Sequence, residues 1–204
     1  MFELFIKGGP VMYLLALCSI IIVYIIIEKY IYLKQQYINP TIVINAIQND
    51  LIRFGKQETL SLLKKHKKAI FRIAGESIKY THLDRNSRQD HIKEASITEI
   101  EKLEKNISYL SAIITIAPIL GLMGTVIGIM DIFNVISGGN IGNPELLSKG
   151  IAEALITTVT GLAITIPGVV FYHQFRHRID MILLGIEQCT YNISLFIQNN
   201  TQIK

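Results

Sequence analysis

The sequence contains few cysteines and none of the short motifs that mark common enzyme sites. Its two cysteines, Cys18 and Cys189, lie in different regions of the 204-residue chain, so no spacing predicts a disulfide framework or a metal site. A GK[ST] phosphate loop, a nucleophile elbow and an HExxH zinc motif are all absent. We therefore expect two unpaired thiols and a protein that is not an enzyme and needs no cofactor.

Charged residues are also scarce over three long stretches of the chain. Half of the residues are apolar, and they gather in runs at 11–27, 110–135 and 150–172. The first run carries no charged residue at all. At about 1.5 Å per residue, the third run reaches roughly 34 Å as a helix, against roughly 30 Å of bilayer hydrocarbon. The sequence therefore predicts an all-α integral membrane protein with three transmembrane helices.

The first apolar run has a rival interpretation as a cleaved signal peptide. However, the residues before it hold one lysine and one glutamate, and Glu28-Lys29-Tyr30 follows in place of a small-residue cleavage site. Pro10 suits the first turn of a helix, where its missing N–H costs nothing. We expect a retained membrane helix.

The polar segment 28–107 holds 15 of the 20 Lys and Arg residues of the chain. Its apolar residues recur at helical spacing, and Pro40 and Gly55 interrupt the first part, which predicts a helical soluble domain. The last helix of this domain shows no stop signal, so we expect it to continue into the second apolar run as one long helix. Its apolar positions are three or four residues apart: Ile97, Ile100, Leu103, Ile107 and Leu110.

A cluster of four lysines and one histidine at 64–68 could bind nucleic acid or anionic lipid. We favour a solvated face on a cytoplasmic domain that lies near a negatively charged leaflet. Membrane lipid is therefore an expected partner, and nucleic acid is not.

The placement of basic residues predicts the orientation of the chain. Segment 28–107 and the stretch after the third run are basic, whereas the loop before that run is nearly neutral, so the N-terminus is expected outside and the C-terminus inside. The second and third membrane helices are expected to extend into long cytoplasmic helices. The predicted division is 1–10 periplasmic N-terminus, 11–27 transmembrane helix 1, 28–107 cytoplasmic helical domain, 108–136 transmembrane helix 2, 137–149 periplasmic loop, 150–172 transmembrane helix 3 and 173–204 cytoplasmic helical tail.

Two histidines follow the third run. His173 and His177 are four residues apart, a spacing that can bind a metal ion on a helix. No third ligand is evident, and Arg176 and Arg178 lie beside them, so we expect a cationic collar at the membrane surface and no metal. A helical stripe of apolar residues then continues into the tail: Ile179, Ile182, Ile186, Ile193 and Phe196 or Ile197.

The second apolar run combines a proline with regularly spaced small residues. Pro118 is expected to kink the helix. Gly121, Gly124 and Gly128 are three and four residues apart, and the last two form a GxxxG pair that permits close approach of another helix. Thr125 either bonds its own backbone or lines a polar path. Asp131 lies near the outer end and is expected at the interface.

The third run carries a carboxylate among hydroxyls. Thr157, Thr160 and Pro167 share a helical face with Glu153, while Thr158 and Thr165 form an adjacent row. An ionisable group within a membrane helix tends to face a protein interior or a water-filled path. A glutamate one turn below the surface can also snorkel to water, so an interfacial role stays open. The stripe as a whole can hold water and relay protons.

The second and third apolar runs together carry a recognisable sequence pattern. APILGLMGTVIGIM at 117–130, followed by KGIAEALITTVTGLAITIPGVVFYH at 149–173, resembles the paired membrane-helix signature of the ExbB/TolQ/MotA proton-channel family. Three membrane helices with one cytoplasmic insertion are similar to the ExbB/TolQ branch. The resemblance implies that Glu153 is the pore-facing glutamate and that Thr125 and Thr158 are the two pore threonines. Thr157 stands where a small residue is common, so its part in the pathway is less defined, and Pro167 joins the packing residues.

The resemblance also implies the partners. It predicts a homopentamer in a bacterial inner membrane that surrounds the single membrane helices of an ExbD/TolR-like protein, whose aspartate carries the proton. Through this protein, the proton motive force would act on a TonB/TolA-like protein that spans the periplasm, for biopolymer uptake or envelope maintenance. The alternatives are a stand-alone ion channel or carrier, and a passive membrane scaffold. The transported substrate or load is not evident from the sequence.

Overall fold

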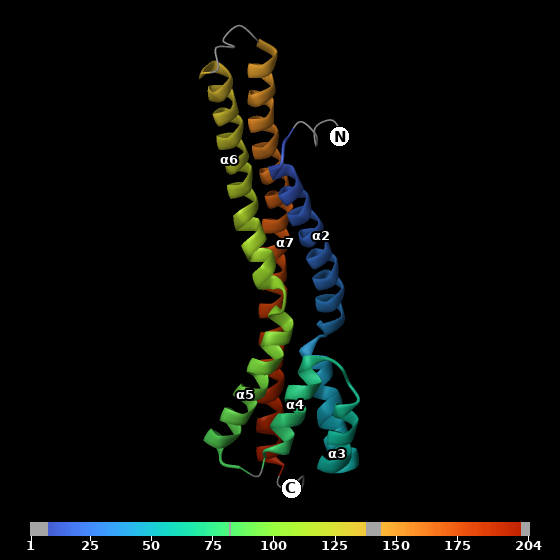
Figure 1. Cartoon of the computed structure of the whole chain (residues 1–204). Helices are drawn as coiled ribbons and strands as arrows, with labels where there is room; N and C mark the ends of the chain where they lie inside the picture. Colours follow the sequence, from blue (N-terminus) through green and yellow to red (C-terminus); the bar gives the residue numbers. More distant parts are fainter. Residues whose placement is uncertain (1–7, 82, 138–143, 201–204) are drawn as a thin grey trace. The chain divides into compact units, whose positions relative to one another are not determined.

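The computed structural model describes residues 8–81, 83–137 and 144–200, and these are all-helical, as predicted. Three helices are long and apolar enough to cross a membrane: Val11–Gln36, Ile107–Asn134 and Ser148–Asn199. The expectation of three such helices is therefore confirmed. The described elements are α2 (Val11–Gln36), α3 (Pro40–Lys64), α4 (Ala69–Lys79), α5 (Arg85–Glu104), α6 (Ile107–Ser137) and α7 (Pro144–Asn199) (Figure 1).

The chain divides into two compact units. The first, here the apolar unit, comprises the residues up to Lys29 and Asn106–Gln174. The second, here the polar unit, comprises Tyr30–Lys105 and the residues from Phe175 onward. Helices α2 and α7 each contribute to both units, because neither is interrupted at the division. Which residues lie in a membrane, and on which side of it, stays a prediction.

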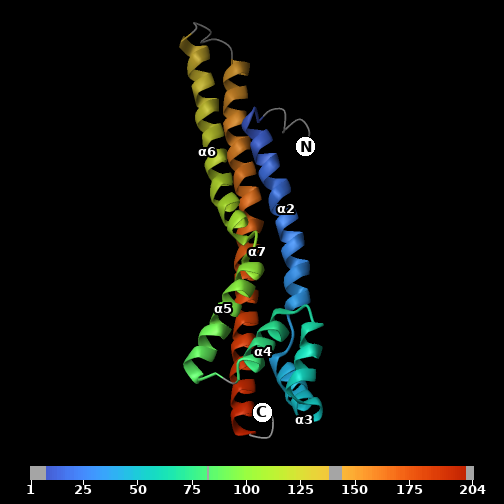
Figure 2. The ribbon, with the colours of Figure 1, turned by 60° about the horizontal axis from the view of Figure 1, so that its bottom comes forward.

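In the apolar unit, α6 lies beside the first part of α7, and α2 lies beside the same part of α7 (Figures 1 and 2). The side of α7 that is buried consists almost entirely of small residues spaced by three, four or seven. Small residues permit close helix approach, which drives association where no hydrophobic effect operates between helices. The buried positions are Gly150, Ala154, Thr157, Gly161 and Gly168.

We expected one continuous helix to run from the soluble domain into the second apolar run. This expectation is wrong, because the helix is interrupted between Glu104 and Ile107. Helix α5 ends at Glu104, and Asn106 has a left-handed backbone with φ 67° before α6 begins. Asparagine visits this region more readily than most residues because its short polar side chain can hydrogen-bond. Here Asn106 Nδ2 donates to Glu28 Oε2 at 2.7 Å, which ties the start of α6 to α2.

The predicted interruptions in the first part of the polar segment are confirmed. Pro40 is the first residue of α3, and Asn39 caps it by accepting a hydrogen bond from the Thr41 N–H at 3.0 Å. Gly55 has φ 74°, so the backbone of α3 leaves helical geometry there. The Thr59 hydroxyl donates to the Gly55 carbonyl oxygen at 2.8 Å and stabilises the second half of the helix.

The polar unit packs α3, α4 and α5 with the last part of α7. Ser77 of α4 and Ser194 of α7 lie 3.0 Å apart at their hydroxyl oxygens, and a Cβ on Gly185 would lie 3.6 Å from Pro40 Cβ. The first four residues of the apolar stripe predicted for the tail, Ile179, Ile182, Ile186 and Ile193, are buried on this part of α7. The buried residues are Phe175, Ile179, Ile182, Ile186, Cys189 and Ile193.

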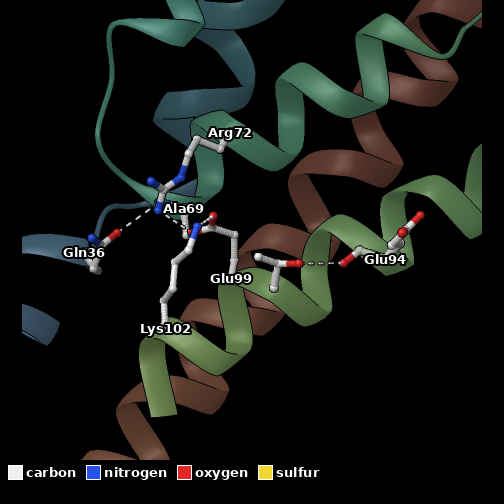
Figure 3. A network of polar contacts seen from close by, with 7 residues as sticks. Gln36, Ala69, Arg72, Glu94, Glu99 and Lys102 are labelled. Carbon is white, nitrogen blue, oxygen red and sulfur yellow. Dashed lines mark hydrogen bonds and ion pairs between the residues drawn. The ribbon is translucent and has the colours of Figure 1, made fainter. Parts of the chain in front are cut away.

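A buried carboxylate links α4 and α5 in the polar unit. Glu99 is only 6% exposed, and it accepts hydrogen bonds from Arg72 and, at 2.8 Å, from Lys102 (Figure 3). A buried charge is costly unless it is paired, and the two cations compensate the charge of Glu99. Close by, Gln36 Oε1 accepts from the Ala69 N–H at 3.0 Å and joins the end of α2 to the start of α4.

The cap of α5 gives a testable dependence on pH. Asp84 Oδ2 accepts from the N–H groups of Asn86 and Ser87 at 3.1 and 3.2 Å. Hydrogen bonds from the Ser87 side chain and backbone hold the pKa of the Asp84 carboxyl below its usual value. The stabilising effect of this carboxylate is therefore present above the ordinary pKa and is lost as pH falls through the lower folded value.

We expect Asp84→Ala to lower the thermal unfolding midpoint at neutral pH, because the first turn of α5 loses its cap. Asp84→Asn keeps a side-chain oxygen that can cap the helix. It is therefore expected to lose only the part of the stability that depends on the charge of the Asp84 carboxylate. Thermal scans by circular dichroism from neutral pH to about pH 3 separate the two effects. A wild-type advantage over Asp84→Asn that grows on acidification would contradict the assignment.

Candidate functional site

Glycines lie where α6 and α7 contact each other. A Cβ at Gly121 would lie 3.0 Å from the Thr157 carbonyl oxygen, and one at Gly128 would lie 2.8 Å from the Gly150 carbonyl oxygen. From the other side, a Cβ at Gly161 would lie 2.7 Å from the Ala117 carbonyl oxygen. Real Cβ atoms essentially never come within 3.0 Å of another atom, and a distance of 3.0 Å, as at Gly121, is tighter than nine in ten real Cβ contacts. The two helices can therefore pair at this distance only while these positions carry no side chain.

Thr157 lies inside this helix pair. Its side chain is fully buried, and it occupies the space that a Cβ on Gly124 would need. The Thr157 hydroxyl donates to the carbonyl oxygens of Glu153 and Ala154, at 3.1 and 2.9 Å. Of the threonines predicted for the pathway, Thr157 is thus the one enclosed between two helices of the same chain.

Thr158 makes a hydrogen bond between the two helices. Its hydroxyl donates to the Gly121 carbonyl oxygen at 3.2 Å, and its side chain is half-buried. Thr125, also half-buried, donates to the Leu122 carbonyl oxygen of its own helix at 2.6 Å. A hydroxyl that donates still has lone pairs that accept, so each of these oxygens can also accept a hydrogen bond from water.

Glu153 lies against the turn that precedes α2. A Cβ on Gly9 would overlap the Glu153 carboxylate, so the side chain is in direct contact with the backbone of Gly9. Gly9 has φ 66°, a conformation that L side chains rarely adopt, and Glu153 is half-buried. Sequence reasoning missed Gly9. The signal that could have pointed to it is the Gly8-Gly9-Pro10 turn before the first apolar run.

The other predicted residues differ in their exposure. Pro118 lies within α6 and is half-buried, and Pro167 lies within α7 and is exposed. Asp131 is exposed near the end of α6. His173 and His177 are also exposed. Within the described parts of the chain, no three His, Cys, Asp or Glu side chains lie close enough together to hold a metal ion.

The remaining faces of the apolar unit are covered by large apolar side chains. On α7, Leu155, Val159 and Ile166 are each more than 60% exposed, and Leu122 and Phe133 of α6 are similar. Contiguous apolar surface of this kind marks contact with lipid or with another protein chain. A single copy of the chain therefore leaves the outer faces of its membrane-spanning helices uncovered.

Sequence comparisons relate this chain to known proteins. The sequence profile described as the MotA/TolQ/ExbB proton channel family matches residues 61–188. A putative biopolymer transport protein, an ExbB homologue of Methanothermobacter thermautotrophicus, is 31% identical over 179 residues, which are 87% of this chain and 63% of the relative.

Two further relatives match shorter stretches. The Tol-Pal system protein TolQ of Haemophilus influenzae is 40% identical over 84 residues, 41% of this chain and 37% of the relative. The biopolymer transport protein ExbB of Salmonella typhimurium is 45% identical over 71 residues, 35% of this chain and 29% of the relative. The chain thus spans less than two thirds of the length of each of these curated relatives.

Proposed function

The chain belongs to the MotA/TolQ/ExbB proton channel family, and we propose that it is the channel subunit of a membrane motor driven by the proton motive force. It is a multi-pass membrane protein, and its family consists of channels and not of enzymes. In the proposed motor, proton flow along the subunits does work on a partner with one membrane helix, similar to ExbD or TolR. That partner acts in turn on a TonB/TolA-like protein across the periplasm, in biopolymer uptake or envelope maintenance.

The observation that carries the proposal is the position of Glu153. It is the one charged side chain of residues 150–172 of α7, it is half-buried, and it lies one turn before the buried Thr157. A carboxyl group at such a position can hold and release a proton, and Thr125 and Thr158 can hydrate its path. Each elementary charge that crosses the membrane is worth about 2.3 kcal/mol per 100 mV, so one proton can bias a switch of a few kcal/mol.

The exposed apolar faces of α6 and α7 support a ring of identical subunits. Lipid can cover only the outer face of such a ring, and neighbouring copies and the partner's helix would cover the rest. We propose a homopentamer around the partner, which must supply the aspartate that this chain does not provide. Thr157 would then act mainly by packing α7 against α6, next to the residues of the proposed proton path.

We propose that the N-terminus faces outward and that segment 28–107 and the tail lie in the cytoplasm. The basic residues of these two segments support this orientation. The inner membrane of a bacterium is the expected location. Because one relative comes from Methanothermobacter thermautotrophicus, the proposal extends to an energised cytoplasmic membrane in general.

Purification with a mild detergent from the native membrane tests the proposed assembly. We expect mass spectrometry to identify a stoichiometric partner with one membrane helix that contains an aspartate. A homogeneous ring without such a partner that conducts protons when reconstituted would instead indicate a stand-alone channel. The same ring without conductance would indicate a passive scaffold. Either result would overturn the motor.

A further inference from the structure

A pocket of about 370 Å³ lies in the polar unit, where the end of α2 meets α7. Its apolar lining includes the buried Leu33 and Ile182, while Lys34 and His177 are exposed and Arg178 is half-buried. The volume is at the lower end of the range for small-molecule sites, about 300–1,000 Å³. The lining residues are Leu33, Lys34, Tyr37, His177, Arg178, Met181 and Ile182.

The charge of this pocket is of one sign. Two permanent cations, Lys34 and Arg178, line it, and the residues that line it include no Asp or Glu. Lys68 donates to the Tyr37 carbonyl oxygen at 3.2 Å, which brings a third cation beside the pocket. Like charges gathered around an apolar recess repel one another, and a bound anion removes that repulsion.

Arg178 differs in this respect from its neighbour Arg176. Arg176 donates to Glu104 Oε1 at 2.6 Å, so a carboxylate already compensates its charge. The Arg178 guanidinium lies 5.3 Å from the centre of the Tyr30 ring. This cation–π contact orients the side chain without neutralising it and leaves N–H donors for a ligand.

The place of the pocket along both helices identifies the source of the anion. Lys34 follows the last residue of the first apolar run by seven positions, and His177 follows the third run by five. At about 1.5 Å per residue these are steps of roughly 7–11 Å, close to the roughly 5–8 Å depth of one headgroup layer. Tyr30 and Tyr37 are residues typical of this layer.

We propose that this pocket binds the phosphate group of an anionic phospholipid, with Lys34 and Arg178 as its main ligands and His177 at its edge. Basic pockets next to membrane helices are suited to such headgroups. The bound lipid would connect the end of α2 to α7 within the polar unit. The inference requires only that the chain spans a membrane and does not depend on the proposed proton pathway.

The test uses the full chain, purified in detergent and mixed with phosphatidylglycerol or phosphatidylcholine, and counts retained lipids by native mass spectrometry. We expect the wild type to retain phosphatidylglycerol preferentially. The double variant Lys34→Gln/Arg178→Gln is expected to retain it at least about tenfold less, since each basic residue near the surface contributes to the attraction. A matched control is Arg53→Gln/Lys93→Gln, which removes two exposed charges that do not line the pocket and is expected to behave like the wild type.

The single variant Lys34→Gln changes an exposed side chain and is expected to fold. It therefore provides the decisive comparison if the double variant fails to fold. Equal retention by the wild type and Lys34→Gln would overturn the proposal. An equal loss in the Arg53→Gln/Lys93→Gln control would also overturn it, because the attraction would then be unspecific. Equal retention of phosphatidylglycerol and phosphatidylcholine by the wild type, together with binding of inorganic phosphate that Lys34→Gln abolishes, would show a site for free phosphate and would reject the lipid assignment.

Discussion

Glu153→Gln is expected to abolish proton-driven work while the amount of assembled protein stays at the wild-type level. Glutamine keeps the size and the hydrogen-bonding capacity of the side chain, so the contact with Gly9 can persist. It cannot hold and release a proton. We expect activity to fall by about a hundredfold or more, as for other essential proton-transfer groups. The measurement is energy-dependent uptake or envelope integrity in cells that carry only the variant.

The matched control for this variant is Asp131→Asn, which removes an exposed carboxylate near the end of α6. It is expected to leave activity unchanged. Wild-type activity of Glu153→Gln would show that Glu153 is an interfacial residue and would remove it from the pathway. A loss of activity matched by an equal loss of assembled protein would favour the scaffold instead.

Gly161→Val is expected to prevent the pairing of α6 with α7. A Cβ at this position would lie 2.7 Å from the Ala117 carbonyl oxygen and 3.3 Å from Gly121 Cα. Both are backbone atoms, so no side-chain rotation can make room, and the helices must separate. Overpacking of a close-packed interior costs about 1–3 kcal/mol, and we expect the upper part of that range or more. The measurement is the fraction of protein that stays monodisperse in detergent after heating.

Gly75→Ala is the control for this substitution. Gly75 lies inside α4, and a Cβ there would have nothing within 4 Å. Alanine is favoured over glycine in a helix interior by about 0.5–1 kcal/mol, so this variant is expected to be slightly more stable than the wild type. If Gly161→Val and Gly75→Ala were equally stable, the close approach of α6 and α7 would not be needed for the fold.

The parts of the fold that depend on nearby residues were predictable from the sequence. The three membrane-spanning candidates follow from the length of the apolar runs, and the interruption of α3 follows from the backbone freedom of Gly55. The division at Asn106 was not predictable in this way. Asparagine is compatible with an unbroken helix, and its left-handed backbone here accompanies a hydrogen bond to Glu28, far away in the sequence.

The candidate site was predictable only as a face of one helix. Spacing places Glu153 and Thr157 on the same side of α7, but it does not say what covers them. In the structure, α6 encloses Thr157, while the turn at Gly9 contacts Glu153. Both contacts join segments that are far apart in the sequence, and a single sequence gives no direct signal for such pairs. The relation of these residues to a proton path stays a prediction.

The burial of Cys189 within the apolar stripe of α7 has a practical consequence for spectroscopy. Its side chain is fully buried, and Cys18 is half-buried in a run without any charged residue. Maleimides react with exposed thiolates, so both native thiols should label slowly in the folded protein. The native cysteines therefore contribute little labelling of their own. Probes can be attached to single introduced cysteines without first replacing the native ones.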